Sequence, residues 1–83
     1  MQTYRIEFRK HAEKFLNSRP LKERQRLLSE IAKLPYAKDV KKMVGYANRY
    51  RLRVGDFRVI YEIHNDVLLI IVLEIGNRGD IYK

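Results

Sequence analysis

The stretch RYRLRVGDFRVIYEI, residues 49–63, alternates large apolar side chains with mainly charged ones on both sides of the dipeptide Gly55-Asp56. A period of two is typical of a half-buried β-strand, and Gly next to Asp favours a turn. The stretch therefore predicts a β-hairpin in which residue 54 pairs with residue 57. Because directly paired residues share one face of a sheet, the large apolar side chains lie together under the predicted helices. They are Tyr50, Leu52, Val54, Phe57, Val59 and Tyr61.

The opposite face of the hairpin gathers positive charge from Arg49, Arg51, Arg53 and Arg58. Like charges that face each other on a sheet destabilise it by up to ~1 kcal/mol per pair. The planar fork of Arg matches phosphate oxygens two at a time, so the convergence predicts an anion-binding site. The alternative is a charged surface that protects the sheet from edge pairing, although Lys serves that purpose at least as well and acidic residues would normally be interspersed.

Outward from the hairpin, the sequence predicts two more strands and two helices. Gln2–Phe8 alternates as a half-buried strand, and Val67–Leu73 is apolar at every position, as in a strand covered on both faces. The loop 35–47 is basic and has no clear period. The helices show apolar residues at helical spacing, first Ala12, Phe15 and Leu16, then Leu21, Leu27, Leu28, Ile31 and Leu34.

The predicted order is β-α-α-β-β-β. Two amphipathic helices packed on one face of a mainly antiparallel four-stranded sheet give a two-layer α+β fold. The length of 83 residues and mass of 10.0 kDa allow a single domain, residues 1–83.

The predicted register also extends to the end of the chain. A two-residue turn at Asn65-Asp66 places Arg58 opposite Leu73, at the far end of the last strand. The tail from residue 76 onward leaves the sheet from that end. We therefore expect Arg78 and Tyr82 to return toward Arg58.

Composition limits the class of protein. Eighteen Lys and Arg against ten Asp and Glu give a net charge of +8, which indicates a polyanionic partner: nucleic acid, an anionic membrane or an acidic protein. Residues 1–55 hold 15 of the basic and 5 of the acidic residues. No Cys and two His argue against disulfides and the usual metal sites. The sequence has no apolar leader and no run near the ~20 residues of a membrane span, so we expect a cytoplasmic protein.

The stretch RYRLRVGDFRVIYEI and the following VLEIGNRGDIYK (residues 72–83) closely resemble the RelE/ParE superfamily of toxins from toxin–antitoxin systems. The resemblance covers essentially the whole chain, and the motifs VGDFRVIY and GNRGDIY look closer to the RelE branch. RelE-type members cut messenger RNA in the ribosomal decoding site, whereas ParE-type members poison DNA gyrase. The resemblance therefore implies a ribosome-dependent endoribonuclease that inhibits translation and that an acidic antitoxin neutralises by covering the basic face.

The resemblance also implies roles for single residues. Arg58 matches the hairpin arginine that holds the scissile phosphate, and Arg78 matches the arginine after the terminal strand. Tyr82 matches the tyrosine that stacks on the cleaved nucleotide or acts on it. Arg49 and Arg51 match two basic positions of the preceding strand, where the best-known members carry lysines. Since Arg is effectively always charged, these two positions are unsuited to a role that requires the loss of a proton.

Such a nuclease needs neither a metal nor a cofactor, because RNA carries its own nucleophile, the 2′-hydroxyl. Arg58 and Arg78 are suited to stabilising charge on the phosphorane-like transition state, and Tyr82 to acid–base chemistry or to stacking. Other basic residues extend the footprint along RNA or serve only as solvated charge; they are Arg53, Lys38, Lys41 and Lys42.

Three other functions stay open. A ParE-like inhibitor of DNA gyrase needs no phosphate clamp and no catalysis. A chain that is folded and antitoxin-bound but inactive would explain the Arg-for-Lys differences. A simple nucleic-acid-binding protein is the third, although we find no helix-turn-helix, zinc or OB-type signature.

Overall fold

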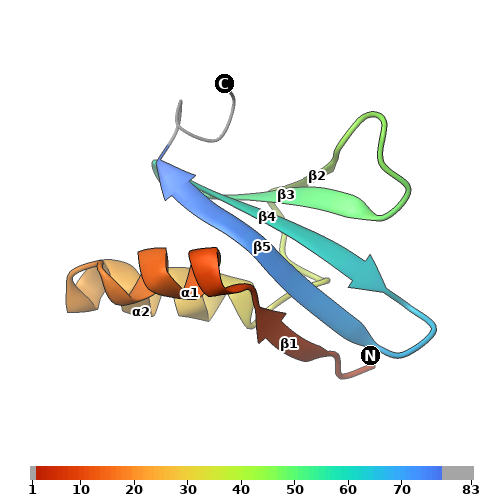
Figure 1. The fold of residues 1–83 in the computed structure, drawn as a ribbon, viewed down its shortest axis with the longest axis horizontal. Coiled ribbons are helices and arrows are strands. Elements are labelled where there is room, and N and C mark those ends of the chain that lie inside the picture. The colour runs from red at the N-terminus through yellow and green to blue at the C-terminus, as the bar shows by residue number, and fades with distance from the viewer. Residues whose placement is uncertain (1, 78–83) are drawn as a thin grey trace.

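The predicted hairpin is formed by β3 (Arg49–Val54) and β4 (Phe57–His64) in the computed structural model, which describes residues 2–77 (Figure 1). Its register is the predicted one, with Val54 opposite Phe57 and Arg53 opposite Arg58. The turn depends on Gly55, whose φ of +58° lies in the left-handed region that favours glycine. The hairpin prediction is therefore confirmed residue by residue.

The described sheet has five strands, one more than predicted. Their order is β1-β5-β4-β3-β2, in which β1 (Arg5–Phe8) runs parallel to β5 (Leu69–Asn77) and every other pair is antiparallel. The extra strand, β2 (Val40–Lys42), lies in the segment 35–47 that we had predicted as a loop. Three residues are too few to display an alternation, so its existence depends on pairing with β3 rather than on a local pattern.

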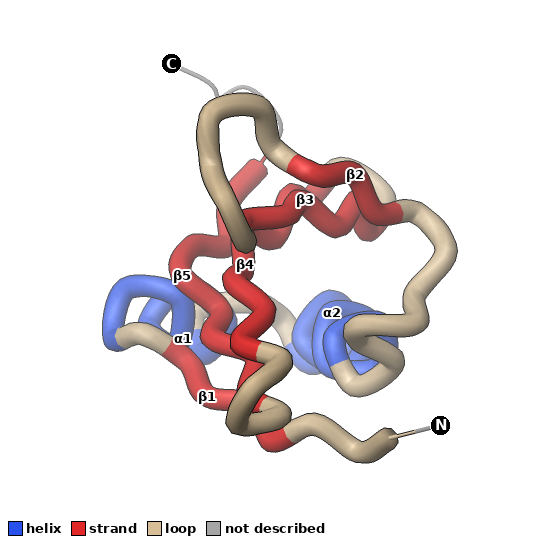
Figure 2. The backbone as a smooth tube through the Cα atoms, turned by 90° about the vertical axis from the view of Figure 1, so that its right-hand side faces the viewer, coloured by secondary structure: helices blue, strands red, loops and turns tan. Residues whose placement is uncertain are grey.

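The two helices, α1 (Lys10–Asn17) and α2 (Leu21–Ile31), lie on one side of the sheet (Figure 1), and Figure 2 shows α1 beside β1 and β5 and α2 beneath β3. Helix α1 contacts β5 and β1, and α2 contacts β3. Together with the sheet they enclose the core. Its fully buried side chains include Leu27, Ile31, Leu52, Val59, Tyr61, Ile70, Val72 and Ile75. The predicted two-layer α+β architecture is thus confirmed apart from the strand count.

The predicted apolar stripe of the second helix is only partly buried. Leu27, Ile31 and Leu34 belong to the core, but Leu21 is 60% exposed and Leu28 is 41% exposed. The reason is geometric: Leu27 and Leu28 are adjacent in sequence and point about 100° apart on a helix of 3.6 residues per turn. One helix face cannot bury both against the sheet.

The predicted antiparallel pairing of β4 with β5 is confirmed, but its predicted register was wrong. The connection is a four-residue loop from Asn65 to Leu68, and β5 carries one extra residue where Ile60 and Tyr61 pair with Glu74 and Val72. A longer loop and a β-bulge each move the register in the same direction. As a result Arg58 lies opposite Gly76 instead of Leu73.

Among the described residues, neither helix is long and apolar enough to cross a membrane.

The neighbours Leu27 and Leu28 provide a test of this packing. Leu27 is fully buried, so we expect Leu27→Ala to lower the free energy of unfolding by about 2–5 kcal/mol. Leu28→Ala removes the same atoms from a half-exposed site on the same helix, and we expect a loss below about 1 kcal/mol. Urea unfolding followed by circular dichroism measures both; equal losses would contradict the placement of α2.

Candidate functional site

The sheet face opposite the helices carries a concentration of cations, and we call it the open face. Alternation along β3 places Arg49, Arg51 and Arg53 on it, because Tyr50, Leu52 and Val54 pack toward the core. Arg58 of β4 pairs with Arg53, and Lys41 of β2 pairs with Arg51, so both share this face.

Arg58 is the centre of this arrangement. It is 6% exposed and is the one charged residue among those described that is buried. Its Nη1 donates a hydrogen bond to the backbone oxygen of Phe57 at 3.1 Å. Its partner across the sheet on one side is Arg53, and on the other side Gly76, which has no side chain. A guanidinium held in a largely desolvated position attracts an anion more strongly than one in water.

The other end of the open face holds a network of charged side chains. Arg49 Nη2 lies 2.9 Å from Glu62 Oε2, and His64 Nε2 lies 3.1 Å from Glu62 Oε1. The Arg49 guanidinium also lies over the ring of Tyr46, 4.4 Å from its centroid. The hydrogen bond from Arg49 holds the pKa of the Glu62 carboxyl below its ordinary value of 4.5. The charge of Arg49 is therefore compensated within the chain.

A second carboxylate compensates Arg53. Its Nε lies 3.1 Å from Asp39 Oδ2, and both side chains are more than half exposed. Exposed pairs of this kind contribute little and are screened by salt, so an incoming phosphate can compete for Arg53.

Glu62 and Asp39 were not among the residues singled out in the sequence. The signal for Glu62 was present, because the confirmed hairpin register pairs residue 49 with residue 62. Asp39 had no such signal, since it lies in the segment that we had predicted as a loop without a strand. Its place beside Arg53 is fixed by a backbone hydrogen bond, in which Arg53 N–H donates to Asp39 O at 2.9 Å.

The structure brings together most of the predicted basic residues and separates two. Lys42 pairs with Tyr50, so it belongs to the helix side of the sheet. Lys38 lines a cavity elsewhere in the molecule. Arg78 and Tyr82 lie outside the described residues. The last described residue is Asn77, which pairs with Phe57, the neighbour of Arg58.

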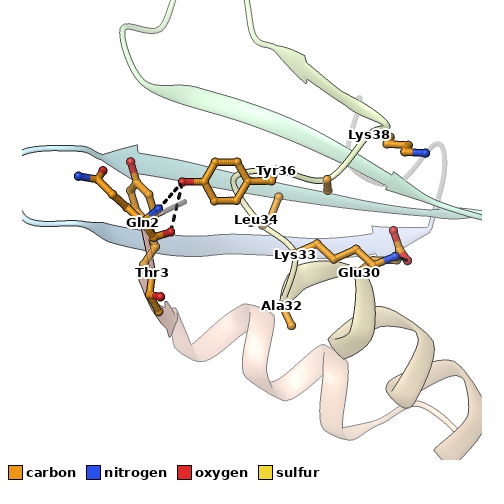
Figure 3. Close-up of a pocket in the computed structure, with 10 residues that line it drawn as sticks. Gln2, Thr3, Glu30, Ala32, Lys33, Leu34, Tyr36 and Lys38 are labelled. Carbon is orange, nitrogen blue, oxygen red and sulfur yellow. Dashed lines mark hydrogen bonds and ion pairs between the residues drawn. The ribbon is translucent and has the colours of Figure 1, made fainter.

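The cavity beside Lys38 has a volume of about 680 Å³ and lies between the N-terminal segment and the end of α2 (Figure 3). Tyr36 closes one side: its hydroxyl accepts a hydrogen bond from Gln2 N–H and donates one to Gln2 O, both at 3.2 Å. None of the open-face cations lines this cavity. Among residues 2–77 we also find no group of three side chains suited to hold a metal ion. Among the described residues, the clustered cations suited to bind an anion therefore lie on the open face.

Tyrosines on the helix side of the hairpin are structural. Tyr50 and Tyr61 stack with their centroids 5.7 Å apart, and Tyr61 is 1% exposed. Burial, with a smaller effect from Tyr50, raises the pKa of Tyr61 to about 12. Tyr61 is therefore neutral near pH 7 and unavailable for proton transfer.

Comparisons with known proteins all find toxins of toxin–antitoxin systems. A family model described as the ParE toxin of type II toxin–antitoxin systems matches residues 5–82. A protein of Methanocaldococcus jannaschii that carries the name RelE1 is 33% identical over 86 residues, which cover 96% of each chain. One chain in the crystal structure of the RelE–RelB complex from Pyrococcus horikoshii is 33% identical, with a TM-score of 0.80 over 95% of this chain and 99% of that one.

A second solved complex, RelB–RelE antitoxin–toxin from Methanococcus jannaschii, contains a chain that is also 33% identical. Its TM-score is 0.74, over 92% of this chain and 94% of that one. The isolated RelE toxin of E. coli shares the fold at 21% identity. It has the same TM-score of 0.74, over 95% of this chain and 90% of that one.

The low pKa of Glu62 makes part of the stability depend on pH. A depressed carboxyl pKa stabilises the fold above pH 4.5, and this contribution is lost as pH falls below 4.5 toward the pKa of the folded state. We expect Glu62→Gln to lower the free energy of unfolding by about 1 kcal/mol at pH 5. The difference between the variant and the unaltered protein should shrink toward pH 3. Urea unfolding of both proteins at several pH values tests this; a difference that stays constant down to pH 3 contradicts it.

Proposed function

Because the chain belongs to the ParE toxin family of type II toxin–antitoxin systems, we propose that it is a RelE-type toxin: a metal-independent endoribonuclease that cleaves mRNA in the ribosomal decoding site and so inhibits translation. The observation that carries the proposal is the row formed by Arg53, the buried Arg58 and Gly76 across three strands of the open face. Support for the RelE branch comes from the relatives at 33% identity, whose names and complexes are RelE.

In the proposed reaction, the 2′-oxygen of the mRNA attacks the adjacent phosphorus while the bond from phosphorus to the 5′-oxygen breaks. The 2′-hydroxyl loses its proton and the leaving 5′-oxygen gains one, so the products are a cyclic phosphate and a free 5′-hydroxyl. Negative charge grows on the non-bridging oxygens in the transition state. Arg58 would stabilise that charge from a fixed position, without reorganisation at the moment of reaction.

Other residues supply the remaining proposed roles. Arg51 and Lys41, paired across β3 and β2, would hold the RNA backbone next to Arg58. Arg78 would assist at the phosphate, and Tyr82 would transfer a proton or stack on the cleaved nucleotide. These last two assignments rest on the resemblance alone, since both residues lie outside the described part of the chain.

We further propose a cognate acidic antitoxin as the partner. The chain has a net charge of +8, which complements an acidic protein, and two of its structural neighbours come from complexes of RelE with RelB. Binding of an antitoxin over the open face would compete with RNA for the same cations.

A second candidate is inhibition of DNA gyrase without catalysis. The description of the matching family model, a ParE toxin, favours it. A cation row at Arg58 is not needed for such an inhibitor, which is why we rank the nuclease first.

The nuclease is tested by adding the purified protein to ribosomes paused on a defined mRNA and mapping new 5′ ends by primer extension. We expect a cut within the decoding-site codon, and a loss of about 10²–10³ in rate for Arg58→Ala if one transition-state donor is removed. Arg5→Ala is the control, because Arg5 is an exposed arginine on the edge strand β1, two strands away from β4, and is paired with Glu7.

Circular dichroism establishes that both variants fold. Full-rate cleavage by Arg58→Ala, or an equal loss in Arg5→Ala, would refute the phosphate clamp. If the unaltered protein cuts neither ribosome-bound nor free mRNA, the nuclease proposal fails, and a gyrase supercoiling assay becomes the next measurement.

A further inference from the structure

The loop between β2 and β3, residues 43–48, exposes two large apolar side chains. Val44 is 98% exposed and Tyr46 is 47% exposed. The loop is anchored at its base, where Met43 N–H donates to Arg49 O at 2.9 Å, and Gly45 turns it with a φ of +89°. In Figure 1 it projects from the sheet on the side away from both helices.

Tyr46 is held in place although it is exposed. The guanidinium of Arg49 lies 4.4 Å from its ring centroid, which is the geometry of a cation–π contact. Arg49 is itself fixed by the bond of 2.9 Å to Glu62. The ring therefore has one side packed on a positioned cation, while almost half of the residue remains accessible to a ligand.

This ring lies at one end of the row of arginines on β3. Arg53, Arg51 and Arg49 follow each other on the open face, and Arg49 is about 13 Å from Arg53 for a strand rise of about 3.3 Å per residue. A single-stranded RNA whose scissile phosphate lies at Arg58 and whose backbone follows these arginines passes Tyr46 with a flanking nucleotide. Cationic grooves that carry exposed aromatic rings are the usual platform for unpaired bases.

We propose that Tyr46 is a stacking platform for a nucleobase that flanks the cleaved phosphate of the mRNA. The proposal rests on the proposed function and adds to it a substrate contact outside the cation row. Because every base has a π face, such a contact tolerates different sequences and positions the strand rather than selecting a codon. The contact between Arg49 and Tyr46 holds the ring before the RNA arrives.

The test separates binding from cleavage. Ribosomes are programmed with mRNA that carries a 2′-deoxy nucleotide at the cleavage position, so that the nucleophile is absent, and the affinity of the labelled protein is measured. We expect Tyr46→Ala to weaken binding about 5- to 150-fold, the loss typical of one stacked base. Tyr46→Phe keeps the ring and restores the affinity. Tyr36→Ala is the matched control, because Tyr36 is 48% exposed and lines the distant cavity.

A single abasic nucleotide, moved through the positions that flank the cleavage site, identifies the stacked base. At one position it should weaken binding of the unaltered protein as much as Tyr46→Ala does, and should add nothing further in Tyr46→Ala. Abasic sites without effect, or losses that add, overturn the proposal.

Three other results also overturn it. Equal weakening by Val44→Ser and Tyr46→Ala, whatever the abasic position, would mean that the loop contacts protein and not a base. Failure of the unaltered protein to cut unmodified mRNA on the ribosome removes the proposed function, and the stacking contact with it. Cleavage by the unaltered protein with unchanged affinity in Tyr46→Ala removes the stacking contact alone.

Discussion

The pairing of Val54 with Phe57 across the turn at Gly55 fixes the direction of every side chain in the hairpin. A shift by one residue would turn Leu52 and Val59 toward solvent and would bury arginines under the helices. The apolar core on one face and the cations on the other are therefore two consequences of a single register. The core maintains that register, because α2 packs on β3 and α1 on β5.

The open face is graded in charge rather than uniformly basic. At one end Glu62 compensates Arg49 in a partly enclosed pair, and at the other end the cation of Arg58 is buried. The charge of Arg53 is compensated only weakly, because its pair with Asp39 is exposed and an external anion can replace the carboxylate. The proposed function places the phosphate at the Arg58 end of this face, where the residues directly across the strands are Arg53 and Gly76.

Local sequence patterns predicted the parts of the fold that depend on short-range periodicity. The hairpin, both helices and the gathering of four arginines on one face follow from alternation and helical spacing. The parts that failed depend on distant partners: β2 exists because β3 pairs with it, and the bulge on β5 changes which residue faces Arg58. The hairpin register also predicts that Glu62 lies opposite Arg49. It does not predict the contact between Tyr46 and Arg49, because that contact depends on the conformation of a loop.

The position of β5 in the sheet has a consequence for how the chain acquires its shape. This strand is the last described element to be synthesised, yet it lies between β1 and β4 and is the only neighbour of β1 among the described strands. Until it is made, the first strand has no partner and α1 lacks the surface on which it packs. Contacts between such distant parts of a chain are slow to form, so we expect β1 and α1 to join the hairpin of β3 and β4 only once β5 has paired with it.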